Sequence, residues 1–170
     1  GQTCIEVAPP HVSAIGLARS ECDIIDPAAL KQAIGDLRPQ VVINAAAYTA
    51  VDQAEENADA ARAANADAPA LIADLCGQYQ SRFVHLSTDF VFDGKGHKPY
   101  GPEAQPAPLG VYGQTKWQGE QAVLERGTQG VVLRTSWVYA PSGRNFVLTM
   151  LRLMRDRGEV KVVSDQIGSP

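Results

Sequence analysis

The chain has 170 residues, of which 45% are hydrophobic and 20% charged, the balance of one globular domain with its own core. A net charge of −4 gives no basic footprint, which counts against nucleic acid as a bulk partner. No apolar run reaches the roughly 18 residues of a membrane helix, so we expect no membrane partner. Cys4, Cys22 and Cys76 form no CxxC pair, which predicts reduced thiols in a cytoplasmic protein rather than disulfides or a zinc site.

The N-terminal part predicts a strand, a helix and a second strand. Val12–Leu17 is a weakly patterned short strand. Asp26 and Pro27 are typical of an N-cap and a first helical position, and Pro39 ends the helix that they begin. The β-branched run Val41–Ile43 predicts a strand buried on both faces.

The middle of the chain predicts a long helical segment, another strand and a loop. The alanine-rich segment Gln53–Tyr79 is helical, and Pro69 predicts a kink or a restart within it. Phe83–Leu86 is the next buried strand. Phe92–Leu109 is rich in Gly and Pro and predicts a long loop, which in a compact domain is usually functional or disordered.

The last part continues the alternation with a helix over Tyr112–Arg126, a strand over Val131–Val138, an amphipathic helix over Asn145–Arg157 and a strand over Val160–Val163. Strand and helix alternate at least four times, and the strands are apolar throughout. This pattern indicates an α/β fold, an open parallel sheet with helices on both faces.

Polar clusters follow three of the predicted strands. They are Asn44–Thr49, Ser87–Asp89 and Thr135–Trp137. Because ligands of open parallel sheets bind beyond the carboxyl ends of the strands, the clusters predict a site there. The alternative is that each cluster is a turn whose Ser, Thr or Asp only caps a helix.

Tyr112 and Lys116 are four residues apart, which places them on one face of a helix. A lysine in that position would lower the tyrosine pKa and suit the phenol to proton transfer near neutral pH. The alternative is an ordinary solvated helix start.

Together these residues resemble the extended short-chain dehydrogenase/reductase superfamily, in which a Ser or Thr at a strand end works with Tyr-x-x-x-Lys. Here the set is Thr88, Tyr112 and Lys116. The chain is similar to the dTDP-4-dehydrorhamnose reductases from Ile24 onward. The stretches that carry this narrower resemblance are Val42–Asp52, Leu86–Gly94, Tyr112–Lys116, Leu133–Tyr139 and Val163–Pro170.

The resemblance implies a Rossmann-like, doubly wound NAD(P)-binding domain over residues 1–170 and NAD(P)H-dependent reduction of the 4-keto group of dTDP-4-dehydrorhamnose to dTDP-L-rhamnose. Tyr112 would donate the proton, Thr88 would polarise the carbonyl, and Lys116 would lower the tyrosine pKa and hold the nicotinamide ribose. Implied substrate contacts are Asp89, Trp137 and Val51. Besides Tyr112 and Lys116, implied cofactor contacts are Gln2, Arg19, Asp23, Ile24, Asn44, Ala45, Ala46, Ala47, Thr49 and Ser87.

The chain departs from the family pattern at both ends. The first strand and its Gly-rich turn are missing except for Gly1-Gln2, and a substrate-binding lobe is expected after Pro170. We therefore expect a piece of a longer protein that has little activity alone. Arg19 suits a 2′-phosphate, which favours NADPH over NADH.

Two alternatives to this activity remain. One is another extended reductase or epimerase that acts on a different nucleotide sugar. The other is a non-catalytic regulatory subunit with the same fold, as in methionine adenosyltransferase. The resemblance also admits a homodimer and a magnesium ion in the longer protein, but the sequence assigns no metal site.

Overall fold

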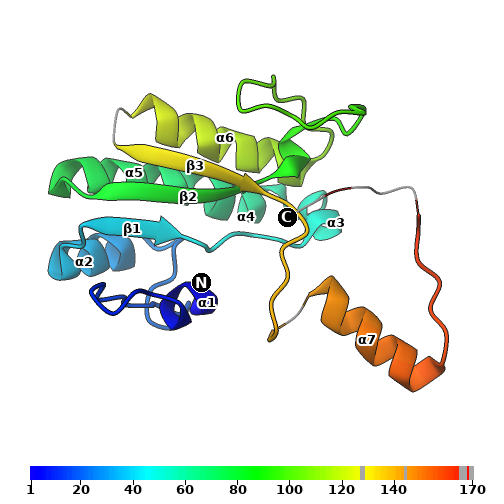
Figure 1. Cartoon of the computed structure of the whole chain (residues 1–170). Coiled ribbons are helices and arrows are strands. Elements are labelled where there is room, and N and C mark those ends of the chain that lie inside the picture. Colours follow the sequence, from blue (N-terminus) through cyan, green and yellow to red (C-terminus); the bar gives the residue numbers. More distant parts are fainter. Residues whose placement is uncertain (127–128, 144, 165–167, 169–170) are drawn as a thin grey trace. The chain divides into compact units, whose positions relative to one another are not determined.

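The computed structural model describes residues 1–126, 129–143, 145–164 and 168. The chain forms two compact units, Gly1–Arg134 and Thr135–Pro170, and each is described by itself. The first unit is built on three strands, β1 (Val41–Asn44), β2 (Arg82–Thr88) and β3 (Gly130–Thr135), in the order β1-β2-β3 (Figure 1). β1 and β2 are parallel, and their register places Asn44 opposite His85. The expected alternation of strands and helices is thus present.

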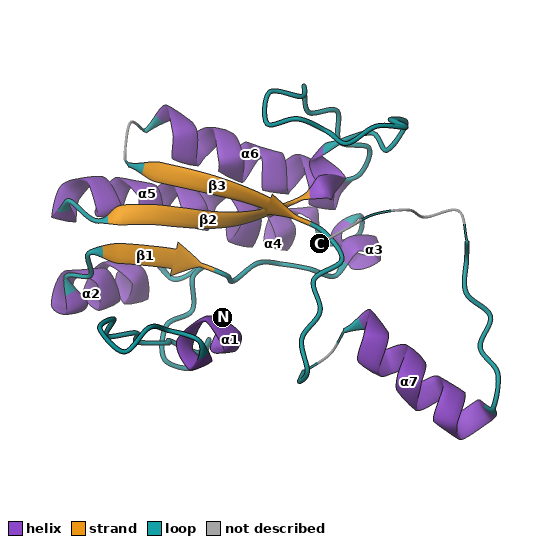
Figure 2. Cartoon of the chain, viewed as in Figure 1, coloured by secondary structure: helices purple, strands orange, loops and turns teal. Residues whose placement is uncertain are grey.

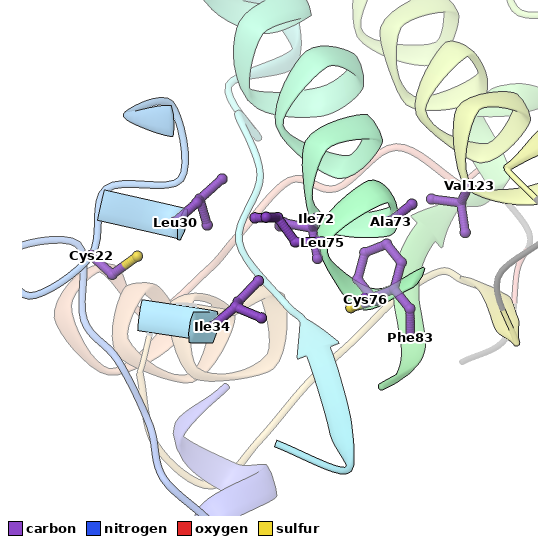
Figure 3. Packing of buried hydrophobic residues seen from close by; sticks show 9 residues of the cluster. All are labelled: Cys22, Leu30, Ile34, Ile72, Ala73, Leu75, Cys76, Phe83 and Val123. Carbon is purple, nitrogen blue, oxygen red and sulfur yellow. The ribbon is translucent and has the colours of Figure 1, made fainter. Parts of the chain in front are cut away.

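The core lies between the sheet and three helices, α2 (Pro27–Leu37), α5 (Ala68–Tyr79) and α6 (Val111–Glu125). Figure 2 shows α5 and α6 running behind the strands. Leu30 and Ile34 of α2 point toward the α5 side chains, and Phe83 of β2 and Val123 of α6 complete the same cluster (Figure 3). This packing holds the start of β2 against the last turns of α6.

The opposite face of the sheet is more open than the sequence predicted. Val41 and Ile43 are 45% and 51% exposed, whereas the β-branched run predicted burial on both faces. Val131 and Leu133 of β3 are exposed in the same way. Only alternate residues of the edge strands meet the α2, α5 and α6 layer, because successive side chains of a strand point to opposite faces.

Helix starts and stops follow the local sequence. Asp26 caps α2, and its Oδ1 accepts the amide hydrogens of Ala28 and Ala29 at 2.8 and 3.3 Å. The helix ends at Arg38, which has a φ of 45°. Both boundaries agree with the prediction from Asp26-Pro27 and Pro39.

The alanine-rich segment is broken into α3 (Val51–Ala54), α4 (Ala58–Arg62), a π-helical turn (Ala63–Asp67) and α5. Pro69 lies in the first turn of α5, directly after the π-helical turn, and the Ala68 amide just before it donates to the Ala63 carbonyl oxygen. The kink or restart predicted at Pro69 takes the form of this π-helical turn, which passes directly into α5. The break before α4 was not predicted.

The remaining elements are short or lie in the second unit. They are α1 (Gln2–Glu6), a 3₁₀ turn (Asp89–Val91) and, in the second unit, α7 (Phe146–Arg157). The Asn145 side chain caps α7 by accepting the Leu148 amide hydrogen at 3.0 Å. Among the described residues, no helix has the length and apolar character needed to cross a membrane.

Two predicted strands do not form. Residues 12–17 and 160–163 have no strand geometry, and β3 ends at Thr135 rather than at Val138. A strand is stabilised by hydrogen bonds to a neighbour, and neither segment has a strand partner within the described sheet. Val12, Ile15 and Leu17 are accordingly 46–63% exposed.

Candidate active site

Thr88 is the last residue of β2 and is buried. Its hydroxyl accepts the Phe90 amide hydrogen at 3.2 Å and donates to Asp89 Oδ1 at 3.1 Å. Thr88 therefore caps the 3₁₀ turn. Capping is the alternative role that the sequence left open for this polar cluster. The cap also fixes its hydroxyl at the carboxyl end of the sheet, toward the start of α6.

Tyr112 lies in the first turn of α6, with its ring edge-on to Phe90 at 5.5 Å between centroids. Burial raises the pKa of Tyr112 above its usual value, the Thr88 hydroxyl opposes this by hydrogen bonding, and the charge of Asp89 adds to it. Lys116 is not among the groups that shift the pKa of Tyr112, because its Nζ is directed to His85 and the Leu86 carbonyl. The predicted lowering of the Tyr112 pKa by Lys116 therefore does not occur in this structure.

Lys116 is 2% exposed and lies one turn after Tyr112. Its Nζ donates to the Leu86 carbonyl oxygen at 2.6 Å and lies 3.4 Å from His85 Nε2. Burial lowers the pKa of Lys116 to about 8, although the Glu120 carboxylate opposes the shift. The ammonium is therefore attached to β2 rather than exposed to solvent.

His85 is fully buried on β2 between two polar side chains. Its Nδ1 lies 3.3 Å from Asn44 Nδ2, and Asn44 Oδ1 accepts the Ala46 amide hydrogen at 3.0 Å. Burial and the neighbouring charge of Lys116 lower the pKa of His85 to about 3. The imidazole is therefore neutral at physiological pH.

Glu120, one turn after Lys116, is 1% exposed and binds Arg134 of β3. The guanidinium makes three contacts with the carboxylate, at 2.6, 3.1 and 3.1 Å, in a bidentate arrangement. The Ser87 hydroxyl donates to the same carboxylate. Ser87, a predicted cofactor contact, thus lies beside a buried ion pair that joins α6 to two strands.

Asn65, in the π-helical turn, joins the loop after β1 to α6. Its Oδ1 accepts the Tyr48 amide hydrogen at 2.8 Å, and its Nδ2 donates to the Tyr48 carbonyl at 3.1 Å and to Thr115 Oγ1 at 3.2 Å. A Cβ added to Gly119 would lie 2.1 Å from the Asn65 carbonyl oxygen, so α6 approaches this turn through a glycine. These contacts hold the segment 45–49 near the start of α6.

The predicted cofactor residues form two groups. Ala45, Ala46, Ala47 and Thr49 follow β1 with exposed or half-buried small side chains, and a Cβ on Gly1 would lie 3.8 Å from Ala45 Cβ. Small side chains beyond a strand end suit a dinucleotide that approaches the backbone. Gln2 bonds to Glu6, Arg19 pairs with Asp23 at 3.0 Å, and Ile24 packs against the core.

The predicted substrate contacts are distributed over both units. Asp89 is exposed beside Thr88, and Val51 is half-buried at the start of α3. Trp137 belongs to the second unit, where its ring is edge-on to Phe146 at 5.7 Å. A cavity of about 180 Å³ in that unit is lined by Trp137, Val138, Tyr139, Phe146, Val147 and Gly168. Residues 165–167 and 169–170 of the predicted closing motif lie outside the described residues.

The sequence reasoning missed His85, Asn65, Glu120 and Arg134. His85 carried one signal, since it alternates with Phe83 and Ser87 on a strand that ends in a candidate site. Glu120 carried another signal, because a residue four positions after Lys116 lies on the same face of a helix. The described residues contain no group of three or more His, Cys, Asp or Glu side chains placed to hold a metal ion.

Known proteins share this sequence and this fold. A dTDP-4-dehydrorhamnose reductase of Burkholderia thailandensis is 45% identical over 156 residues, which cover 92% of this chain and 52% of that protein. A probable dTDP-4,6-dihydroxy-2-methyloxan-3-one 4-ketoreductase of Streptomyces antibioticus is 44% identical over 155 residues, 91% of this chain and 52% of that protein. The chain spans about half the length of these curated relatives.

The crystal structure of dTDP-4-dehydrorhamnose reductase from Bacillus anthracis in complex with NADP superposes with a TM-score of 0.95 at 38% identity, covering 100% of this chain and 61% of that one. The predicted Rossmann-like α/β fold is thereby confirmed. The family model described as RmlD substrate binding domain matches residues 4–170. The chain belongs to this RmlD family.

Proposed function

We propose that the protein carrying this chain reduces the 4-keto group of dTDP-4-dehydrorhamnose to dTDP-L-rhamnose with NADPH, or with NADH. The observation that carries the proposal is the convergence of Thr88, Tyr112 and Lys116 where β2 ends and α6 begins. Relatives named for this reaction, and one solved with NADP, support it.

The cofactor, when bound, would supply a hydride to C4 of the sugar. Tyr112 then donates its hydroxyl proton to the carbonyl oxygen, so that hydride and proton together form the alcohol. The raised pKa of Tyr112 keeps the phenol protonated at neutral pH, as an acid requires. Thr88 donates a hydrogen bond to the same oxygen as negative charge develops on it.

The binding roles proposed for the longer protein are those that the family resemblance implies. Asn44, the three alanines after it, Thr49 and Ser87 would line the cofactor, with Gln2, Arg19, Asp23 and Ile24 toward its adenosine end. Lys116 would hold the nicotinamide ribose. Asp89, Val51 and Trp137 would contact the nucleotide sugar, since a carboxylate binds sugar hydroxyls and an indole offers an apolar wall with one donor.

We also propose that residues 1–170 form the NAD(P)-binding domain of a longer protein whose substrate lobe follows Pro170. The half-length match to the relatives supports this division. The three free cysteines suit a cytoplasmic location. A homodimer belongs to the same proposal and is tested by the mass of the full-length protein in solution.

The test is turnover by the purified full-length protein. With dTDP-4-dehydrorhamnose and NADPH we expect consumption of NADPH and formation of dTDP-L-rhamnose, identified by NMR. NADH in place of NADPH measures the cofactor preference. Absence of turnover with both cofactors, although the protein binds them, would favour a non-catalytic relative.

A second candidate is a 4-ketoreductase for another dTDP-linked ketosugar. The Streptomyces antibioticus relative favours it. That protein is 44% identical to this chain, nearly the 45% of the Burkholderia thailandensis reductase. The same assay with a panel of dTDP-4-ketosugars separates the two, since the true substrate has the highest kcat/KM.

A further inference from the structure

The first turn of α6 is capped by a carboxylate from another part of the chain. Gly110, the residue before the helix, has no side chain to cap it, although its carbonyl oxygen accepts the Gln114 amide hydrogen at 3.0 Å. Glu55 supplies the cap, because its Oε1 accepts the Val111 amide hydrogen at 2.8 Å. The first amide hydrogens of a helix have no acceptor within it, and a negative charge beside them is favourable. Glu55 therefore stabilises the turn that carries Tyr112.

Gly110 leaves the room that this contact needs. A Cβ at position 110 would lie 2.7 Å from Glu55 Oε1, closer than nonbonded carbon and oxygen atoms approach. The backbone of Gly110 has a φ of −124° and a ψ of 170°, a conformation that any residue adopts. The glycine is therefore required by the carboxylate and not by the backbone.

Glu55 joins α6 to the segment that follows β1. It lies at the C-terminal end of α3 with a helical φ of −63°, four positions after Val51, so the two side chains share one face of that helix. Val51 is an implied substrate contact, and Tyr112 directly follows the capped residue Val111. The contact thus links one implied wall of the sugar site to the proposed proton donor.

The rest of α6 is held independently of Glu55. Asn65 donates to Thr115 Oγ1 at 3.2 Å, and Val123 belongs to the hydrophobic core. The buried Glu120 is bound by Arg134 of β3. We therefore expect loss of the Glu55 contact to loosen the first turn of α6 and to leave the body of the helix in place.

We propose that Glu55 is a positioning residue for Tyr112: by capping α6 from α3, it fixes the first turn of the helix, and with it the phenol, relative to Val51. A proton donor must lie within hydrogen-bond reach of the carbonyl oxygen, and a misplacement of about 1 Å lowers a rate by up to about a hundredfold. The catalytic consequence rests on the proposed reductase function, but the cap itself does not.

Amide hydrogen exchange of the full-length protein, followed by NMR, measures the cap without any substrate. We expect the Val111 amide to exchange about fivefold faster in Glu55→Ala, because the lost cap frees this hydrogen for contact with water. Glu55→Gln keeps an oxygen acceptor and should retain most of the protection. The matched control is Asp26→Ala, which removes the cap of α2 and should speed exchange at Ala28 without changing Val111. Equal Val111 exchange in Glu55→Ala and the unmodified protein would overturn the proposal.

Turnover separates positioning from stability. We expect Glu55→Ala to lower kcat for the ketosugar about tenfold, while the Kd for NADPH changes by less than about twofold. Glu55→Gln should restore most of the kcat. Asp26→Ala loses a cap on a helix that holds none of the proposed catalytic residues and should retain full kcat. Full kcat in folded Glu55→Ala would contradict the positioning role.

A second variant disturbs the same contact from the helix side and decides the matter if Glu55→Ala does not fold. The Cβ of Gly110→Ala would displace the Glu55 carboxylate, the end of a flexible side chain, from the Val111 amide. We expect the same faster exchange and lower kcat as in Glu55→Ala, and no further change in the double variant, because both substitutions remove one contact. Unchanged Val111 exchange in Gly110→Ala, or additive effects of the two substitutions, would refute the role.

A protein without the reductase activity gives a different result from a protein without this positioning. Protection of Val111 that depends on Glu55, together with absence of ketosugar turnover, would contradict the reductase only. An active enzyme in which Glu55→Ala changes neither Val111 exchange nor kcat would contradict the Glu55 proposal only.

Discussion

The substitution Gly119→Ala tests the packing that holds α6 against the π-helical turn. The added Cβ would lie 2.1 Å from the Asn65 carbonyl oxygen and 3.2 Å from its carbon. Ordinary contacts of carbon with other heavy atoms are about 3.5–4.0 Å. Both partners are backbone, so the overlap is relieved only if α6 or the turn moves by about 1 Å.

The expected cost combines two opposing effects. Alanine in a helix interior is about 1 kcal/mol more favourable than glycine. Forcing extra volume into a packed site costs about 1–3 kcal/mol. Displacing Asn65 also disturbs its hydrogen bonds to Tyr48 and Thr115, each of which contributes about 1 kcal/mol. We therefore expect a net loss of about 2 kcal/mol in the free energy of unfolding.

Urea unfolding followed by circular dichroism measures this loss. The matched control is Gly35→Ala in α2, where the nearest atom to the added Cβ is the Tyr79 hydroxyl at 3.2 Å, the end of a side chain that can rotate. That variant should change stability by less than about 1 kcal/mol in either direction. Equal stabilities of the two variants would refute the reasoning from close packing.

Two further predictions concern the buried charges. Arg134→Met leaves the Glu120 carboxylate buried without its guanidinium and should destabilise the fold by roughly 2–4 kcal/mol, whereas Arg126→Met, which breaks the more exposed pair with Asp74, should cost less than about 1 kcal/mol in the same urea assay. Lys116 and His85 should each contribute stability that rises with pH, at up to about 1.4 kcal/mol per unit. Between pH 8 and 10.5 the unfolded chain holds the Lys116 proton that the folded chain has lost, and between pH 3 and 6.5 the unfolded chain alone charges His85. Burial raises the pKa of Cys76 to about 11, which gives the opposite slope above about pH 9. The Lys116 contribution is therefore the difference between the unmodified protein and Lys116→Met in unfolding at a series of pH values, and equal alkaline slopes of the two would contradict it.

Local features of the fold could be predicted because their causes lie within a few residues. Asp26 and Pro27 begin α2, a π-helical turn precedes Pro69, and the amphipathic segment predicted over 145–157 forms α7. The polar residues at the ends of β1 and β2 were predicted for the same reason, since a strand that stops in Asn44 or Thr88 places these side chains beyond the sheet. The placement of Tyr112 and Lys116 one turn apart on α6 could likewise be predicted from the helical period alone.

Features that depend on distant parts of the chain could not be predicted. The strand expected at 12–17 needs a hydrogen-bonding neighbour, which its own sequence does not specify. The partner of Lys116 depends on the register that places Asn44 beside His85 and on the depth at which α6 packs. Burial is the largest influence on the pKa of Tyr112, and the four-residue spacing from Lys116 does not predict how deeply Tyr112 is buried.

The central claim is that Tyr112 donates the proton in ketosugar reduction, and the most direct test is turnover by the full-length Tyr112→Phe variant. We expect kcat with dTDP-4-dehydrorhamnose and NADPH to fall at least about a hundredfold, as for loss of a general acid, while the Kd for NADPH changes little. Tyr79→Phe, which removes a hydroxyl from α5 outside the proposed site, should retain full activity. Full activity of Tyr112→Phe would contradict the account.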